Sequence, residues 1–169
     1  MIDLYFAKLR DGAVIPSKRD EDAGYDIYAC FDMPYIIIRQ GETVLVPTGI
    51  ASAFGKDYYV QLHERGSMAV RGIATRAGVI DSGYRGEWNI GLTNLASLPF
   101  VIMKHDAQAV LMDETGLDDT NAVLYPISKA TCQAVLLPVP KARVTEISMD
   151  ELRAMKSERG DGMMGSSRK

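Results

Sequence analysis

Short hydrophobic runs with a two-residue period, separated by turn residues, make up most of this chain. The runs that predict strands are residues 35–38, 43–46, 58–63, 87–93, 100–103, 122–125 and 133–139. In the fourth run, Trp88, Ile90 and Leu92 share one face, so the pattern predicts a half-buried strand there. Prolines recur throughout the chain and restrict helix to short pieces. Together these patterns predict an all-β fold.

Two short helices are expected beside the strands. One starts after Arg65, and the other starts at Ser148, where Ser-Met-Asp-Glu forms a capping box. The stretch 104–120 is polar and irregular, which predicts an insertion between two strands or an extra hairpin. Residues 158–169 are rich in glycine and serine and predict a mobile tail after a single domain at 1–157.

Composition limits the classes of function. The chain has 169 residues, of which 47% are hydrophobic and 24% charged, as in one globular domain. A net charge of −3 with both signs interspersed argues against a nucleic-acid polymer as partner. No apolar run approaches the roughly 20 residues that cross a bilayer, so no membrane partner is expected. Two cysteines and an N-terminus unlike a signal peptide predict a cytoplasmic location.

The densest block of candidate chemistry is Gly-Val-Ile-Asp-Ser-Gly-Tyr-Arg-Gly-Glu at 78–87. It predicts a β-hairpin with Asp81 at its tip. A carboxylate in this position can act as a general base on water, and exposed backbone groups can recognise the edge of a planar base. An ordinary Asx turn is the alternative, and for this block alone it is the more common one.

Two further blocks suit phosphate and metal. Arg65 precedes Gly66, Ser67 and a possible helix start, a combination that suits phosphate oxygens, although a solvated turn is the alternative. In the block 22–29, Asp26 offers an oxygen ligand for Mg²⁺, and a strand-entry turn is the alternative. The glycine-rich tail after Arg159 can close over a phosphate chain, but it lacks the Lys-Ser/Thr ending and the helix of a P-loop.

Taken in order, these four blocks and a strand that carries Gln133 resemble the five motifs of trimeric dUTPases, from Ala23 to Ser167. The resemblance implies a distorted jelly roll of the β-clip type and a homotrimer whose active sites each use residues from all three subunits. It also implies Mg²⁺-dependent hydrolysis of dUTP to dUMP and pyrophosphate. That reaction limits uracil incorporation into DNA and supplies dUMP for dTMP synthesis.

The resemblance also implies a role for individual residues. Asp81 would activate the water that attacks the α-phosphorus, and Tyr84 would lie under the deoxyribose and exclude a 2′-hydroxyl. Asp26 would face Mg²⁺ through its waters. Backbone groups that would recognise uracil belong to Gly78, Val79, Ile80 and Asn89. The residues implied to contact the phosphates are Arg65, Gly66, Ser67 and Gln133. Those implied to close over the substrate are Arg159, Met164, Gly165 and Ser166.

Three of the five motifs depart from the family pattern. Gly66 stands where the second motif usually has serine, and the fourth motif, which ends at Gln133, lacks its usual acid and arginine. Met164 replaces the phenylalanine that stacks on uracil, so weaker stacking on the base is predicted. The stretch 104–120 is extra, as in some phage members. It is either a solvated surface segment or a site for a protein partner.

Two alternative functions follow from the same residues. A dCTP deaminase shares the fold but uses a glutamate on the strand after the third motif, where this chain has Gly91. A dUTPase-like regulatory protein, which binds a protein partner and has weakened catalysis, would fit the altered motifs and the extra stretch. A purely structural jelly roll does not explain why all five motifs occur in order.

Overall fold

The computed structural model describes residues 2–158 and residue 160. The chain divides into two compact units, Met1–Val139 and Pro140–Lys169, which are described separately. The compact β unit therefore ends earlier than the expected domain at 1–157. Within the described residues, no helix is long and apolar enough to span a membrane.

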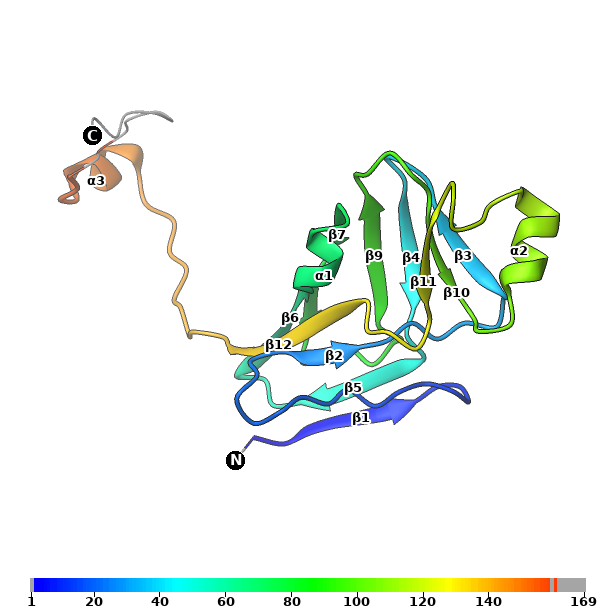
Figure 1. The fold of residues 1–169 in the computed structure, drawn as a ribbon. Helices are drawn as coiled ribbons and strands as arrows, with labels where there is room; N and C mark the ends of the chain where they lie inside the picture. Colours follow the sequence, from blue (N-terminus) through cyan, green and yellow to red (C-terminus); the bar gives the residue numbers. More distant parts are fainter. Residues whose placement is uncertain (1, 159, 161–169) are drawn as a thin grey trace. The chain divides into compact units, whose positions relative to one another are not determined.

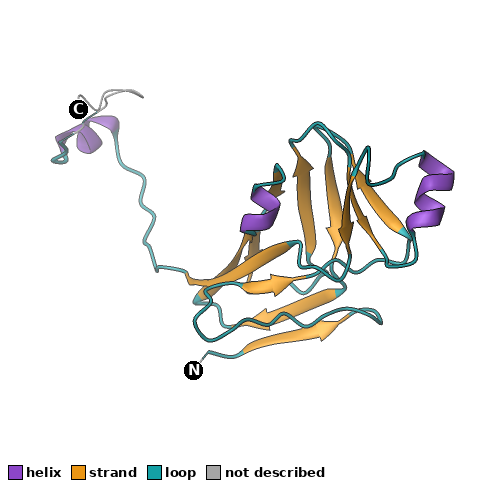
Figure 2. Cartoon of the chain, viewed as in Figure 1, coloured by secondary structure: helices purple, strands orange, loops and turns teal. Residues whose placement is uncertain are grey.

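The first unit consists mainly of strands (Figures 1 and 2). In chain order these are β1 (Leu4–Lys8), β2 (Tyr25–Ile27), β3 (Tyr35–Ile38), β4 (Thr43–Pro47), β5 (Ile50–Phe54), β6 (Tyr58–Glu64), β7 (Ile73–Arg76), β8 (Val79–Asp81), β9 (Asn89–Asn94), β10 (Phe100–Met103), β11 (Val123–Pro126) and β12 (Cys132–Pro138). The helices of this unit are α1 (Gly66–Ala69) and α2 (Gln108–Thr115). The all-β prediction and the short helix after Arg65 are confirmed.

The strands form small sheets with the orders β1-β5, β11-β10-β3, β4-β9-β7 and β2-β12-β6-β8. Figure 1 shows β3, β4, β9, β10 and β11 running side by side, with β1, β2 and β5 crossing below them. Nearly all the pairings join antiparallel strands distant in sequence, such as β2 with β12, as in a jelly roll. This topology brings the N-terminal block at 22–29 beside the strand that carries Gln133.

Large apolar side chains fill the space between these sheets. Trp88, Ile90 and Leu92 are fully buried, as their alternation predicts. The opposite face of β9 is buried as well, and Thr93 is only 5% exposed. The prediction of a half-buried strand is therefore wrong, because residues 90–94 of β9 are buried on both faces and only Asn89 is exposed.

The segment 78–87 is not a β-hairpin, so that prediction is also wrong. β8 pairs with β6, whereas β9 pairs with β4 and β7 in a different sheet. The chain changes sheets at Trp88, whose buried backbone N–H donates to the Ile50 carbonyl while its own carbonyl accepts from the Thr48 hydroxyl. Burial of the Trp88 side chain favours this crossing over a local turn.

The extra stretch 104–120 forms a helical crossover, so the extra-hairpin alternative is wrong. β10 and β11 are parallel neighbours, and parallel strands require a crossover rather than a tight turn. Helix α2 lies on that crossover, at the far end of the β11-β10-β3 sheet in Figure 1. Leu111 is fully buried in a second small cluster with Val101 and Met103.

The second unit contains α3 (Met149–Ala154). The capping box predicted at Ser148 is present. The Ser148 hydroxyl accepts from the Glu151 backbone N–H, and the Glu151 carboxylate accepts from the Ser148 backbone N–H. Donation from the Ser148 backbone N–H and from the Ser148 hydroxyl to the Glu151 carboxylate lowers the pKa of that carboxyl. Local signals alone are sufficient to define the start of this helix.

Candidate active site

The first candidate half-site is a polar cleft of about 910 Å³ between β2, α1 and β12. It gathers five residues that the sequence analysis assigned to metal or phosphate, namely Asp26, Arg65, Gly66, Ser67 and Gln133. They meet because Asp26 of β2 is the cross-strand partner of Gln133 of β12, and β12 pairs in turn with β6, which leads into α1. We call this cleft the charged half-site.

Opposite charges are paired inside the charged half-site. The Arg65 guanidinium donates through Nε to Asp26 Oδ1 at 3.0 Å and through Nη2 to Asp26 Oδ2 at 3.4 Å. Arg65 Nη1 also donates to the Ala130 carbonyl at 3.2 Å. About a third of each ionised side chain remains exposed, 32% for Arg65 and 35% for Asp26. The fork is therefore held in one orientation and is still accessible to an anion.

Gln133 is fixed in the same cleft. Its amide nitrogen donates to the Glu64 carbonyl at 3.1 Å, which ties β12 to the residue before Arg65. Gly24 leaves room for this side chain, because a Cβ there would lie 2.8 Å from Gln133 Oε1. The glycine of the block 22–29 therefore has a packing role that the sequence pattern did not reveal.

Charged residues at the rim of the cleft were missed by the sequence analysis. Arg19 and Asp22 form a bidentate ion pair with distances of 2.8 and 3.0 Å. Hydrogen bonding from Arg19 lowers the pKa of the Asp22 carboxyl. Lys18 also lines the cleft, and its ammonium lies 5.5 Å from the centre of the Tyr25 ring. The charge run at 18–22 was the only sequence signal for this rim.

The second candidate half-site is a smaller pocket of about 200 Å³ at the end of β8. Its lining includes Val79, Ile80, Asp81, Tyr84 and Asn89, all of which were predicted as site residues. We call it the loop half-site, because residues 82–88, which connect β8 to β9, form one wall. Asp81 is the last residue of β8, so it lines the pocket where this loop begins.

Gly78 allows β8 to approach β6. A Cβ at Gly78 would lie 2.7 Å from Gln61 Nε2 and 2.8 Å from the Leu62 carbonyl oxygen. The Gly78 carbonyl accepts from the Leu62 backbone N–H at 2.7 Å. The residue before it, Ala77, has a φ of 51°, which is unusual for a residue with a side chain. The strained residue Ala77 and the close contact of Gly78 with β6 therefore both lie just before Asp81 in the chain.

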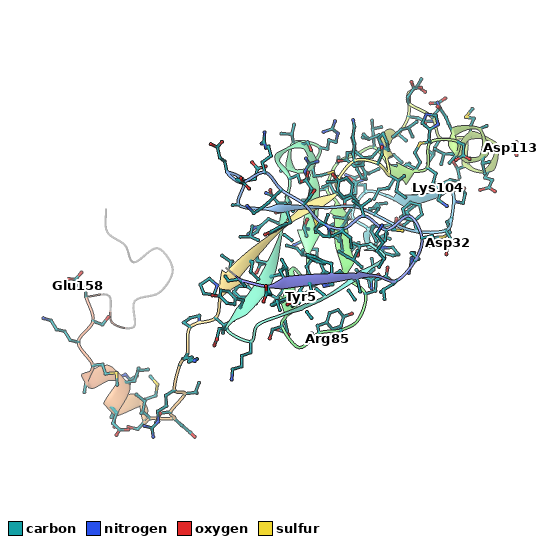
Figure 3. The ribbon with its side chains drawn as sticks, turned by 90° about the horizontal axis from the view of Figure 1, so that it is seen from below. Tyr5, Asp32, Arg85, Lys104, Asp113 and Glu158 are labelled. Atoms are coloured by element: carbon teal, nitrogen blue, oxygen red, sulfur yellow. The ribbon has the colours of Figure 1, made fainter. Side chains whose placement is uncertain are left out.

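The connecting loop is held by several hydrogen bonds. The Tyr84 hydroxyl donates to the Glu87 carbonyl at 2.9 Å, which folds the ring back over Gly86. Arg85 Nη1 donates to the Ser82 carbonyl at 2.6 Å and reaches the Ser52 carbonyl of β5 at 3.4 Å. Figure 3 shows Arg85 close to β1, the strand that pairs with β5.

The two half-sites lie at opposite edges of the β2-β12-β6-β8 sheet. Asp26 is in register with Gln133 and, through it, with His63, whereas Asp81 is in register with Tyr59. Four residues at about 3.3 Å each and three strand spacings of about 4.8 Å each place these aspartates roughly 20 Å apart in a flat sheet. The two aspartates therefore line separate pockets rather than one shared cleft.

The donor set for a metal is sparse. Among the residues that the structure describes, no three His, Cys, Asp or Glu side chains come together as a metal site. Asp26 provides one carboxylate in the charged half-site, with Glu21 and Asp22 at its rim. This set fits Mg²⁺, which is commonly held by one or two carboxylates together with substrate phosphates and water.

The tail residues predicted to close over the substrate are Arg159, Met164, Gly165 and Ser166. They lie outside the described residues, so their roles stay predictions. Neither cysteine is suited to nucleophilic chemistry, because burial raises the pKa of both the Cys30 and the Cys132 thiol.

The model of the dUTPase family matches residues 10–123. A deoxyuridine 5′-triphosphate nucleotidohydrolase of Mycolicibacterium gilvum is 34% identical over 158 residues, which cover 90% of this chain and 86% of the relative. A protein of the same name from Rickettsia bellii is 38% identical over 106 residues, covering 61% and 67%.

Solved structures share the fold at low sequence identity. The dUTPase of Staphylococcus bacteriophage 80alpha with dUpNHpp aligns with a TM-score of 0.73 and 20% identity, covering 98% of each chain. A mutant dUTPase from phage phi11 of S. aureus, known for the coordination of a structural Mg(II) ion, aligns with a TM-score of 0.65 and 19% identity, covering 86% of this chain and 96% of that one. Their shared architecture agrees with the distorted jelly roll expected from the sequence.

Proposed function

Because this chain belongs to the dUTPase family, we propose that it hydrolyses dUTP to dUMP and pyrophosphate. The observation that carries the proposal is the sorting of the predicted site residues into two pockets of different chemistry. One pocket has the charges that a triphosphate requires, and the other has a carboxylate beside an aromatic ring and exposed backbone. Such an enzyme limits uracil incorporation into DNA and supplies dUMP.

The loop half-site provides the base and sugar contacts. Backbone groups from Gly78 to Ile80, with Asn89 opposite, recognise the edge of uracil. The Tyr84 ring supports the deoxyribose and leaves no room for a 2′-hydroxyl, because its hydroxyl is already bonded to Glu87. This arrangement discriminates against cytosine and against ribose.

Asp81 acts as the general base in the same half-site. It accepts a proton from the water that attacks the α-phosphorus. A bond forms between the water oxygen and that phosphorus while the bond to the bridging oxygen of the β-phosphate breaks. The electron pair leaves with pyrophosphate, and dUMP keeps the new oxygen. The position of Asp81 at the end of a paired strand fixes its carboxylate relative to the loop.

The charged half-site binds the triphosphate. The Arg65 guanidinium forms charge-assisted hydrogen bonds to phosphate oxygens, and Ser67, Gln133 and the backbone at Gly66 complete the contacts. Negative charge accumulates on the leaving pyrophosphate, so these donors stabilise the transition state more than the bound substrate. Arg159 and the tail residues Met164, Gly165 and Ser166 cover the nucleotide and exclude water.

Asp26 would hold Mg²⁺ through coordinated waters, beside the phosphates of the bound substrate. When bound, the ion would supply positive charge that offsets the phosphate charge. The sparse protein donor set supports a metal that arrives with the nucleotide.

The active site is shared between subunits of a homotrimer. The separation of roughly 20 Å between Asp26 and Asp81 in one sheet supports a working centre whose two half-sites come from different chains. Cyclic symmetry then generates three identical centres from three chains. The cytoplasm, which contains the nucleotide pool, is the proposed location.

Deamination of dCTP is not supported. Gly91 stands where a deaminase needs a glutamate, and a Cβ there would lie 3.1 Å from the Arg76 carbonyl oxygen. A side chain at this position would therefore press on the neighbouring strand β7. A protein partner at residues 104–120 stays a hypothesis. Binding assays with a variant that lacks the α2 crossover would contradict it if every interaction of the full chain persisted.

The decisive test is pyrophosphate release from dUTP, dTTP, dCTP and UTP with Mg²⁺. We expect release from dUTP alone, and loss of that release in Asp81→Asn. The proposal would be overturned if dCTP yielded pyrophosphate and ammonia. It would also be overturned if the folded oligomer released no pyrophosphate from any of the nucleotides.

A further inference from the structure

Glu87 ends the block 78–87 and was given no role of its own. It lines the loop half-site and accepts hydrogen bonds on both of its carboxylate oxygens. Oε2 accepts from Arg10 Nη2 at 2.7 Å, and Oε1 accepts from the Gly49 backbone N–H at 2.7 Å. The Glu87 side chain is 19% exposed and that of Arg10 is 30% exposed. An ion pair this sheltered is stronger than a pair on the open surface.

The partners of Glu87 are themselves fixed. Arg10 Nη1 donates to the Cys30 carbonyl at 3.0 Å, so the guanidinium bridges two distant segments. Gly49 has a φ of 68°, and a Cβ there would lie 2.9 Å from the Ala13 side chain and 3.0 Å from Arg10 Cγ. Only glycine allows this backbone to direct its N–H at the carboxylate while Arg10 packs beside it.

Glu87 connects its ion pair with Arg10 to Tyr84, the residue proposed to support the deoxyribose. The carbonyl of Glu87 is the acceptor for the Tyr84 hydroxyl, at 2.9 Å. Gly86 lies under the ring, since a Cβ at that position would be 2.5 Å from the Tyr84 hydroxyl oxygen. The orientation of the Tyr84 ring therefore depends on where residues 86 and 87 are held, and the Glu87 carboxylate decides that position.

We infer that Arg10 and Glu87 are positioning residues that set the discrimination between deoxyribose and ribose by holding Tyr84. The inference rests on the proposed function of the loop half-site. Arg10 is more than 70 residues before Tyr84 in the chain, and its hydrogen bond to the loop is made to Glu87. Loss of either member of the ion pair frees the Tyr84 ring to shift, and a shifted ring admits the 2′-hydroxyl.

The test compares Glu87→Gln, Arg10→Gln and the double variant with the wild-type enzyme. We expect each single variant to lower the ratio of kcat/KM for dUTP to that for UTP about tenfold, mainly through a lower KM for UTP, because the shifted ring admits the 2′-hydroxyl. The double variant should be no worse than either single one, because both changes break the same contact. Arg10→Lys, which keeps the charge, should retain most of the selectivity. Glu114→Gln removes a carboxylate that accepts from Tyr35 beside α2, and serves as the control.

Fluorescence separates positioning from general damage. The chain has one tryptophan, Trp88, which directly follows Glu87 and is fully buried. We expect its emission and the melting temperature to stay near those of the wild type in Glu87→Gln. The inference would be overturned by a selectivity loss that comes with red-shifted Trp88 emission. An unchanged selectivity ratio, or losses that add up in the double variant, would overturn it as well.

Binding of products distinguishes this inference from the proposed function. Affinities for dUMP and UMP, measured by calorimetry, report on sugar recognition without hydrolysis. If wild-type enzyme released no pyrophosphate from dUTP, the proposed function would fail. A preference for dUMP over UMP that disappears in Glu87→Gln would still support the positioning role, and equal binding of both by the wild type would contradict it.

Discussion

The two half-sites of this chain are built in different ways. The loop half-site is held by neutral and charge-assisted hydrogen bonds that end on backbone carbonyls and N–H groups, such as those to Ile50, Ser52 and Gly49. The charged half-site is held by an ion pair between Asp26 and Arg65, whose side chains are each about one-third exposed, at 35% and 32%. The loop half-site is therefore fixed by the fold, whereas the charged half-site consists of ionised side chains that can also pair with a ligand.

This difference matches the parts of the substrate. A base and a sugar are distinguished by shape and by single hydrogen bonds, so their site must be rigid before binding. A triphosphate with Mg²⁺ carries charges of both signs. When no ligand is bound, the charges of Asp26 and Arg65 neutralise each other, so the site avoids the free-energy cost of an unpaired ion. The comparison predicts that changes in the loop half-site affect chemistry and specificity, whereas changes in the charged half-site affect affinity for phosphates.

The largest effect is expected for Asp81→Asn. The amide keeps the shape of the side chain but cannot accept a proton from water, so kcat should fall about 10³-fold with little change in KM. Steady-state pyrophosphate release measures both constants. Asp113→Asn on α2 is the matched control and should behave like the wild type. A rise in KM with unchanged kcat would place Asp81 in binding rather than catalysis.

Arg65→Gln should have the next largest effect, and on affinity. Losing the guanidinium removes the paired hydrogen bonds to phosphate and leaves Asp26 unpaired, so affinity for dUpNHpp should fall about 10²-fold. Affinity for dUMP should change much less, because only one phosphate remains. Calorimetry with both nucleotides checks this difference, with the exposed Arg39→Gln as control. Equal losses of affinity for dUpNHpp and dUMP would contradict the assignment of phosphate binding to the charged half-site.

Mixing the two impaired variants, assayed at a dUTP concentration at which each alone has little activity, sharpens the comparison further. If each centre takes its loop half-site and its charged half-site from different chains, oligomers refolded from equal amounts of Asp81→Asn and Arg65→Gln contain intact centres. Random assembly should restore about a quarter of the wild-type activity. Separately refolded variants mixed afterwards, without exchange of subunits, are the control. Recovery no greater than the mean of the two variants would show that each chain uses its own half-sites.

The smallest effect is expected for Gly78→Ala and concerns stability. The added methyl would lie against Gln61 and the Leu62 carbonyl, so β8 must move away from β6 and the free energy of unfolding should fall by about 1.5 kcal/mol. Gly83→Ala in the connecting loop meets no atom within 4 Å and is the matched control. Urea denaturation of both variants measures the difference. Equal stability would show that the close approach of β8 to β6 is not required.

Much of the fold follows from the pattern along the chain. Runs such as those of β3 and β10 begin and end where alternation and prolines predict, and the helix at Ser148 starts at its capping box. Strands with weak patterns were missed, including β2 and β5, because a three-residue strand or one rich in alanine carries little periodicity. The order of chemical blocks was sufficient to indicate the family, since that order is a property of the chain alone.

The sequence by itself determined which residue types are present for the chemistry, in what order, and which segments are extended. Tertiary structure alone decided that β8 and β9 belong to different sheets, that Gln133 lies beside Asp26, and that Glu87 meets Arg10 and Gly49. The reason is physical. Periodicity reports which face of a strand is buried, whereas pairing between distant strands depends on how the whole apolar surface is covered at once.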